Sequence, residues 1–139
     1  MTVYFMIGYP GSGKSTYAQA ILDDGGEGCV KLDGDALKTA TNIRDALIKA
    51  LKEGKSVIID ATNMTLARRT PLFEAIKSLP KTQQPTEIIG VWCDLDLETS
   101  YLRNKEREKP VSKIAYYKLR KDFVEPALSE GFDLIIKVE

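Results

Sequence analysis

Nine consecutive residues near the amino terminus, residues 8–16, have the types and spacing needed to hold a phosphate group. Gly8 and Gly13 bracket four residues and are followed by Lys14 and Ser15, which is the pattern of a phosphate-binding loop. Glycines allow a tight turn that directs backbone N–H groups inward, toward an anion. We expect Lys14 to reach the β- and γ-phosphates of a nucleoside triphosphate, and Ser15 to bind Mg²⁺.

The segments on either side of this loop support that interpretation. Residues 3–7 are apolar and β-prone, as in a buried parallel strand, and residues 14–22 can form a helix whose positive dipole end faces the same anion. The residues expected to contact the nucleotide are Gly11, Ser12, Gly13, Lys14, Ser15 and Thr16. A glycine-rich turn that only connects a strand to a helix is a poorer explanation, because the lysine, the hydroxyl group and both flanking elements occur together.

The rest of the chain alternates between strands and helices. Further strands are expected at residues 29–32, 56–60, 86–93 and 132–138. Helices are expected after a cap at Thr41 or Asn42, from about Thr65, from about Asp96, and after a cap at Ser112. The second of these helices is expected to carry Leu66, Phe73 and Ile76 on one face. The fourth bears Lys113, Lys118, Arg120 and Lys121 among Ile114, Tyr117 and Val124. This alternation predicts an α/β protein with a parallel sheet.

Carboxylates follow two of the expected strands. Asp33 and Asp35 come directly after the second strand, and Asp60 ends the third, where a Walker-B-type metal residue is expected. Because ligands bind at the carboxyl edge of open parallel sheets, these side chains should lie near the phosphate-binding loop. A role restricted to turns and helix caps remains open for Asp33 and Asp35.

Residues 103–111 have almost no apolar side chain to bury and are expected to form a lid. From Arg103 to Lys121 there are eight basic residues and two acidic ones, enough for a local path along phosphates. A charged loop that faces only solvent is the alternative for this segment.

Composition limits the remaining possibilities. The 139 residues, 43% of them hydrophobic, predict one domain over residues 1–139. Twenty basic and 20 acidic residues exclude a global positive field, and the lack of histidine argues against zinc chemistry. Cys29 and Cys93 lie in apolar segments and are expected to be buried thiols. Without a membrane-spanning segment or a signal pattern, we expect an intracellular, cytoplasmic protein with no membrane partner.

Four segments together resemble a known family. The phosphate-binding loop, the Asp33-Gly34-Asp35 turn, residues 60–63 and the tail from Pro110 are similar to the kinase domain of polynucleotide 5′-kinases, as in phage end-healing enzymes and animal DNA-repair kinase-phosphatases. The resemblance covers essentially the whole chain. It implies a P-loop NTPase fold, a three-layer α/β/α arrangement with a five-stranded parallel sheet and a short lid. It also implies ATP and Mg²⁺ as cofactors, a 5′-hydroxyl end of DNA or RNA as acceptor, and a separate phosphatase or ligase as partner.

The resemblance also implies roles for single residues. Lys14, Asp35 as general base and Arg107 as a lid arginine would be catalytic, and Ser15 and Asp60 would hold the metal. Arg103 and Arg120 would also bind the nucleotide. The acceptor would be bound by Asp35, Lys38, Thr62 and Asn63. This chain departs from the family at Asp33-Gly34, where Asn-Arg is frequent, and Lys38 replaces an arginine without its bidentate fork.

Two other functions fit parts of the pattern. A basic lid over ATP also suits a kinase of a small metabolite, of the gluconate or nucleoside monophosphate type. A nucleotide-dependent switch would use the loop for conformational change, with water as the only acceptor. Asp35 argues against the switch, which has no need of a carboxylate placed as acceptor base.

Overall fold

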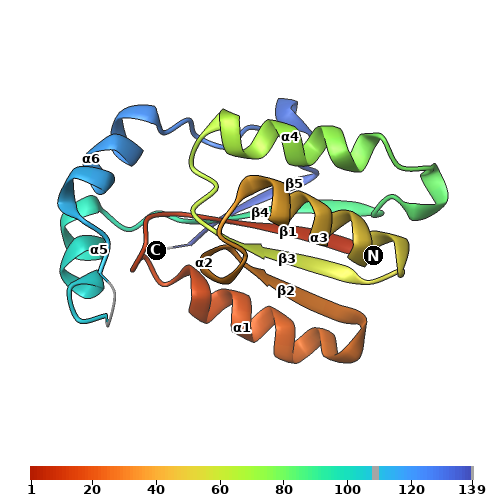
Figure 1. Cartoon of the computed structure of the whole chain (residues 1–139), viewed down its shortest axis with the longest axis horizontal. Coiled ribbons are helices and arrows are strands. Elements are labelled where there is room, and N and C mark those ends of the chain that lie inside the picture. The colour runs from red at the N-terminus through yellow and green to blue at the C-terminus, as the bar shows by residue number, and fades with distance from the viewer. Residues whose placement is uncertain (108–109, 139) are drawn as a thin grey trace.

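The structure, a computed structural model, describes residues 1–107 and 110–138. Its centre is a sheet of five parallel strands in the order β2-β3-β1-β4-β5 (Figure 1). The strands are β1 (Thr2–Ile7), β2 (Cys29–Asp33), β3 (Ser56–Asp60), β4 (Glu87–Cys93) and β5 (Leu134–Val138). The predicted five-stranded parallel sheet is therefore confirmed.

Helices cover both faces of this sheet. Figure 1 shows α1 on one face, α3 and α4 on the other, and α5 and α6 together beyond one end. The α-helices are α1 (Lys14–Gly25), α2 (Gly34–Leu37), α3 (Ala40–Lys52), α4 (Leu66–Lys77), α5 (Leu97–Asn104) and α6 (Lys113–Asp122). Short 3₁₀ helices occupy Gly26–Gly28, Lys81–Gln83 and Leu128–Glu130. The predicted three-layer arrangement is confirmed.

The larger part of the core lies between the sheet and the helices α3 and α4. Phe5 of β1 stacks on Phe73 of α4 with ring centroids 4.8 Å apart, and Phe132 meets both rings edge-on. Offset and edge-to-face pairs of this kind add to the free energy of burial. This packing fixes α4 relative to the sheet, and the turn that precedes the helix is attached to it.

Several local expectations need correction. The cap of α3 is Thr39, not Thr41 or Asn42, and its hydroxyl accepts a hydrogen bond from the Asn42 N–H at 3.1 Å. The helix begins earlier because Lys38, with φ 70°, ends α2 and the extended backbone of Thr39 follows at once. Ser112 caps α6 as predicted, and the buried side chain of this helix is Tyr116, whereas Ile114 is 80% exposed.

Other residues expected on apolar faces also reach solvent. Leu66 is 42% exposed, because it occupies the first turn of α4 at the edge of the sheet, ahead of the part of the helix that packs on the core. Phe73 and Ile76 are buried as predicted. Both cysteines are buried and free, which confirms that prediction. Among the described residues, no helix has the length and apolar character needed to cross a bilayer.

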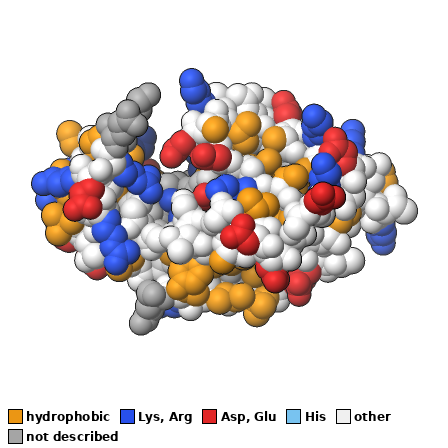
Figure 2. All heavy atoms as spheres, turned by 90° about the horizontal axis from the view of Figure 1, so that it is seen from below, with side chains coloured by type: hydrophobic (Ala, Val, Ile, Leu, Met, Phe, Trp, Pro, Cys, Tyr) orange, Lys and Arg blue, Asp and Glu red, His pale blue; other side chains and the backbone are white. Residues whose placement is uncertain are grey.

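On the sheet face that carries α1, the edge strand β5 is not covered by the helix. Leu134 and Ile136 on the edge strand β5 are 46% and 41% exposed. Figure 2, which looks at this face, shows apolar side chains gathered along its lower edge. Neither Leu134 nor Ile136 lines the cavity of the candidate site described below, so the patch does not contribute to that site.

Candidate active site

The phosphate-binding loop connects β1 to α1 and presents the amino terminus of that helix. Gly13 caps α1 in a left-handed conformation, with φ 92°, and no side chain caps the first N–H groups. The first amides of a helix lack backbone acceptors and carry its positive dipole end, so they form an anion site. The geometry of the loop fits a phosphate group.

Lys14 lies at the base of this loop. Its side chain is buried, and its Nζ is 3.5 Å from the carbonyl oxygen of Tyr9. Burial lowers the pKa of Lys14 below its ordinary value, an effect that nearby Asp60 and Asp35 oppose and that Arg107 reinforces. A phosphate group would supply the counter-charge that a buried ammonium group requires.

Ser15 and Asp60 meet beside Lys14, as the sequence predicted for a metal site. The Ser15 hydroxyl donates to Asp60 Oδ2 at 3.1 Å, and Asp60 Oδ1 is buried without a hydrogen-bond partner. Mg²⁺ takes few protein oxygens and completes its shell with water and phosphate oxygens. This hydroxyl and this unpaired carboxylate oxygen fit such an ion; in the described part of the chain, no cluster of three or more acidic, cysteine or histidine side chains offers a different site.

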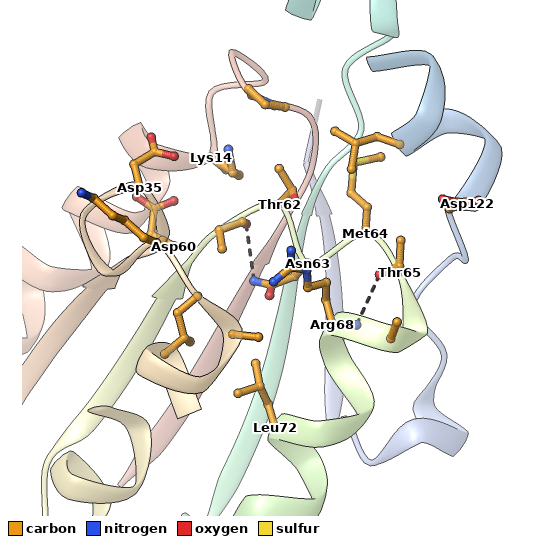
Figure 3. Close-up of a pocket in the computed structure, with 18 of the residues that line it drawn as sticks. Lys14, Asp35, Asp60, Thr62, Asn63, Met64, Thr65, Arg68, Leu72 and Asp122 are labelled. Atoms are coloured by element: carbon orange, nitrogen blue, oxygen red, sulfur yellow. Dashed lines mark hydrogen bonds between the residues drawn. The ribbon is translucent and has the colours of Figure 1, made fainter. Parts of the chain in front are cut away.

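A cavity of about 1270 Å³ extends from the phosphate-binding loop toward the carboxyl ends of β3 and β2. Its walls come from the carboxyl ends of β2 and β3, from the starts of α3 and α4, and from α6. Figure 2 shows the molecule hollowed between the lobe with α5 and α6 and the remainder, and Figure 3 shows Asp35, Lys14 and Asp60 on one side of the cavity, with Asp122 across from them. A sugar-sized ligand would leave much of this space empty, because ordinary small-molecule pockets measure roughly 300–1,000 Å³.

Most of the predicted site residues line this one cavity. They are Lys14, Ser15, Asp35, Lys38, Asp60, Thr62, Asn63 and Arg107. Gly11, Ser12, Gly13 and Thr16 belong to the loop and to the first turn of α1 and do not line the cavity. Arg103 lies in the last turn of α5, outside the cavity wall, and Arg120 lines a second, smaller cavity beside Trp92 and Phe123. Nucleotide contacts by Arg103 and Arg120 stay predictions.

Asn63 lines the cavity and also connects two strands of the sheet through its side chain. Its Nδ2 donates to the carbonyl oxygens of Met6 at 2.7 Å and Ile59 at 3.2 Å, and Ala61 accepts a longer bond. These bonds fasten the ends of β1 and β3 to each other. The amide nitrogen of Asn63 is therefore engaged by the backbone, and its contact with an acceptor stays a prediction.

The charges around the cavity are unevenly paired. Among the described residues, five cationic side chains of the wall form no ion pair with any other: Lys14, Lys38, Arg68, Arg107 and Lys118. Arg44, by contrast, has Asp45 at 3.5 Å. Unpaired cations in a concave surface attract and hold an anionic ligand.

The sequence analysis missed Arg68, although it follows the expected start of a helix at the ligand-binding edge. This position could have indicated a ligand-binding role for Arg68, because a basic residue in the first turn of a helix interacts unfavourably with the helix dipole. Figure 3 shows its side chain running from α4 toward the turn with Thr62 and Asn63.

Tyr116 and Asn104 were also missed, and Tyr116 holds the phosphate-binding loop to α6. The Tyr116 hydroxyl donates to the carbonyl oxygen of Pro10, and its ring stacks on Tyr9. Burial raises the pKa of Tyr116 to about 12, so this donor keeps its proton at neutral pH. Aromatic residues at helical spacing gave no signal for this contact, because neighbouring Tyr117 offers the same chemistry.

Asn104 joins the two ends of the expected lid. Its backbone carbonyl accepts from the Arg107 N–H at 3.0 Å, and its Nδ2 donates to the Val111 carbonyl oxygen at 3.0 Å. The lid predicted for residues 103–111 includes residues 108 and 109, which lie outside the described residues. Arg107 is thereby placed at the cavity wall by its link to the end of α5.

Comparisons with known proteins show which proteins this chain is similar to. The Zeta toxin family model matches residues 2–45. The bifunctional polynucleotide phosphatase/kinase of Schizosaccharomyces pombe is 30% identical over 141 residues, covering 98% of this chain and 33% of that protein. A fungal RNA kinase matches with a TM-score of 0.78 and 18% identity, over 99% of this chain and 73% of that one.

The fold is that of the P-loop kinases. A gluconokinase from Sinorhizobium meliloti shares it, with a TM-score of 0.64 and 17% identity over 99% of this chain and 81% of that one. The sequence resemblance to polynucleotide kinases is confirmed by the curated relatives. The chain spans about a third of the length of these relatives.

Proposed function

We propose that this P-loop kinase transfers the γ-phosphate of ATP to the 5′-hydroxyl end of a DNA or RNA strand. The observation that carries the proposal is the cavity of about 1270 Å³, which joins Lys14 and Asp35 to cationic side chains without ion-pair partners. A strand end offers a hydroxyl group for Asp35 and phosphates for the cations. The curated relatives, named polynucleotide phosphatase/kinases, support this choice of acceptor.

Asp35 would act as the general base. It lies in the first turn of α2, where its N–H donates to Asp33 Oδ1 at 2.9 Å, and its own carboxylate lines the cavity. As the 5′-oxygen attacks the γ-phosphorus, Asp35 takes the hydroxyl proton and the bond from the γ-phosphorus to the β,γ-bridging oxygen breaks, releasing ADP. Asp33 caps α2 and holds Asp35 in place.

Lys14 and Arg107 would offset the charge that spreads over the γ-phosphoryl oxygens. Both cations line the cavity, and the positive charge of Arg107 adds to the effect of burial in lowering the pKa of Lys14, so an anion bound there would offset their repulsion. Mg²⁺ held by Ser15 and Asp60 would neutralise charge on the β- and γ-phosphate oxygens. A protein catalyses phosphoryl transfer by positioning the two reactants and by stabilising the charge of the transition state.

The acceptor would lie across the cavity from the donor. Lys38, at the end of α2, and Arg68, at the start of α4, are placed to contact phosphates next to the reacting nucleotide. The apolar part of the wall, which includes Ile43, Leu72 and Leu119, suits a base or a sugar ring. A phosphatase or ligase that acts on the same ends remains the kind of partner we propose for this activity.

A small-metabolite kinase is the second candidate, because the gluconokinase shares the fold. A panel assay separates the two: radiolabelled ATP with a 5′-hydroxyl oligonucleotide, gluconate, nucleoside monophosphates or water as acceptor, for the wild type and for Asp35→Asn. We expect label on the oligonucleotide and a rate about 10²–10⁴-fold lower in Asp35→Asn, the usual contribution of a general base. Label on gluconate or a monophosphate but not on the oligonucleotide would establish the alternative, and phosphate release to water alone would indicate a switch.

A further inference from the structure

Arg69, the neighbour of Arg68 on α4, is fully buried, which is unusual for an arginine. Its Nε donates to Glu130 Oε1 at 2.8 Å, and its Nη2 donates to Glu130 Oε2 at 3.1 Å. Nη2 also donates to the Val124 carbonyl oxygen at 2.8 Å, and Nη1 to the Asn63 carbonyl oxygen at 2.9 Å. One guanidinium group therefore connects three segments that are distant in the sequence.

One of these segments is the turn of residues 61–65, which we call the acceptor turn. It joins β3 to α4 and lines the cavity with Thr62, Asn63 and Met64. The carbonyl oxygen of Thr62 accepts from the Gly8 N–H at 3.0 Å, and that of Met64 accepts from the Val124 N–H at 3.0 Å. The acceptor turn is thus held on one side by the phosphate-binding loop and on the other by the segment after α6.

The conformation of the acceptor turn depends on such contacts. Asn63 has φ 47°, in the left-handed region, which residues other than glycine adopt rarely, although asparagine does so more readily than most. Such a conformation persists when the surrounding structure over-determines it. The Asn63 side chain fastens the turn to β1 and β3, and Arg69 fastens the Asn63 carbonyl from the opposite direction.

Stability alone does not account for this arrangement. A buried ion pair can often be replaced by apolar residues of similar size with little loss of stability, whereas removal of one partner is strongly destabilising. An apolar pair at positions 69 and 130 would fill the space but would leave the carbonyls of Asn63 and Val124 without their donor. Besides its packing, the guanidinium group therefore orients the carbonyl groups of Asn63 and Val124.

We propose that Arg69 is a positioning residue that sets the acceptor turn, and that Glu130 holds Arg69 in the orientation required. Arg69 acts through Thr62, Asn63 and Met64 and does not itself line the cavity. The inference rests on the proposed function, because it assigns the acceptor to this wall. The nucleotide site should be affected less, because Lys14 and Ser15 lie in α1, to which Arg69 makes none of these hydrogen bonds; the acceptor turn meets the loop through the bond from the Gly8 N–H to the Thr62 carbonyl oxygen.

The test compares Arg69→Met, the double variant Arg69→Met/Glu130→Leu and Arg69→Lys with the wild type. Thermal unfolding, affinity for a fluorescent ATP analogue, and KM and kcat with a 5′-hydroxyl oligonucleotide are measured for each. We expect the single variant Arg69→Met to lose stability and the double variant to regain most of it. The double variant should nevertheless keep a kcat/KM for the acceptor about 10–100-fold below wild type, with ATP affinity changed less than about threefold. Arg69→Lys should be intermediate.

A matched control uses the exposed pair Lys55 and Glu53, 3.3 Å apart before β3 and at the opposite edge of the sheet. Lys55→Met/Glu53→Leu should leave both KM values unchanged. If the double variant at positions 69 and 130 regains wild-type kcat/KM together with stability, Arg69 is only structural and the proposal is wrong.

Amide hydrogen exchange gives a readout that does not require activity. The N–H groups of Gly8 and Val124, which donate to the carbonyl oxygens of Thr62 and Met64, should exchange faster in the double variant, while the amides of α1 keep their wild-type rates. Unchanged exchange at Gly8 and Val124 overturns the positioning role. A wild type that labels no oligonucleotide overturns the proposed acceptor instead, and the exchange result then still decides whether Arg69 sets the turn.

Discussion

Gly11 lies against the backbone of Ser100, so closely that a Cβ atom on Gly11 would be 2.5 Å from the Ser100 carbonyl oxygen. Gly11 also has φ 81°, which disfavours any side chain. The phosphate-binding loop and α5, which leads to Arg107, are therefore in direct backbone contact. A change at this point should alter both the loop and the helix that carries the lid arginine.

The first prediction concerns this contact. Gly11→Ala should lower the free energy of unfolding by about 2–4 kcal/mol, because the strain of a positive φ adds to an overpacking clash. Gly54→Ala is the matched control, since Gly54 has φ 76° but no atom within 4 Å of its Cβ position. Chemical denaturation should show a smaller loss of unfolding free energy in Gly54→Ala than in Gly11→Ala. Equal losses would mean that the backbone at Ser100 moves to accommodate the added methyl group without destabilising the protein.

The second prediction concerns the pH dependence of nucleotide binding. Burial lowers the pKa of Lys14 below 10.5, so the folded protein releases this proton at a pH at which the unfolded chain still holds it. Stability of the nucleotide-free protein should therefore rise as pH increases through the folded pKa toward 10.5. ATP affinity should fall over the same range, because the triphosphate favours the charged lysine.

Titration of a fluorescent ATP analogue at a series of pH values measures that fall. In Lys14→Arg the guanidinium group stays charged, so any remaining affinity should be independent of pH in this range. A wild-type affinity that holds constant up to pH 10.5 would show that the lysine is not desolvated in solution.

The third prediction concerns Arg107. If its contact with the γ-phosphoryl group forms mainly in the transition state, Arg107→Ala should lower kcat by about 10³-fold or more and change ATP affinity far less. Arg107→Lys should rescue poorly, because an ammonium group lacks the planar fork. Steady-state kinetics and ATP binding are compared, and a variant impaired in affinity alone would make Arg107 an ordinary phosphate contact.

The fourth prediction concerns Arg68. Arg68→Ala should raise the KM for a 5′-hydroxyl oligonucleotide about fivefold to tenfold, leave the KM for ATP unchanged, and make the acceptor KM less dependent on salt. Lys49→Ala, on the exposed side of α3 and outside the cavity wall, is the control. Salt titrations of KM that give the same slope for Arg68→Ala and for the wild type would exclude a phosphate contact at this position.

The donor half of the site could be predicted from the sequence because its signals are local. The spacing of glycines, Lys14 and Ser15 specifies a loop, and the rule that ligands bind at the carboxyl ends of parallel strands brings Asp35 and Asp60 to it. The register confirms this convergence, since Met6 and Asp33 both pair with Asp60.

Residues whose role depends on distant partners could not be predicted. Arg69 is buried because Glu130, 61 positions away, faces it, and no local pattern indicates such a pair. In α6 the sequence offers two adjacent tyrosines, and only the position of the phosphate-binding loop decides that Tyr116 is the one that turns inward. Tertiary contacts, not helical spacing, settled both cases.

The strand order has a consequence for how the molecule is made. β1 pairs with β3 and β4, not with β2, so β1 gains its second neighbour only when β4 has been synthesised, more than 80 residues later. Pairings between segments so far apart in the chain form slowly. Because the phosphate-binding loop follows β1 directly and rests on Ser100 and Tyr116, a nascent chain should acquire the capacity to bind nucleotide late, after α6 has been translated.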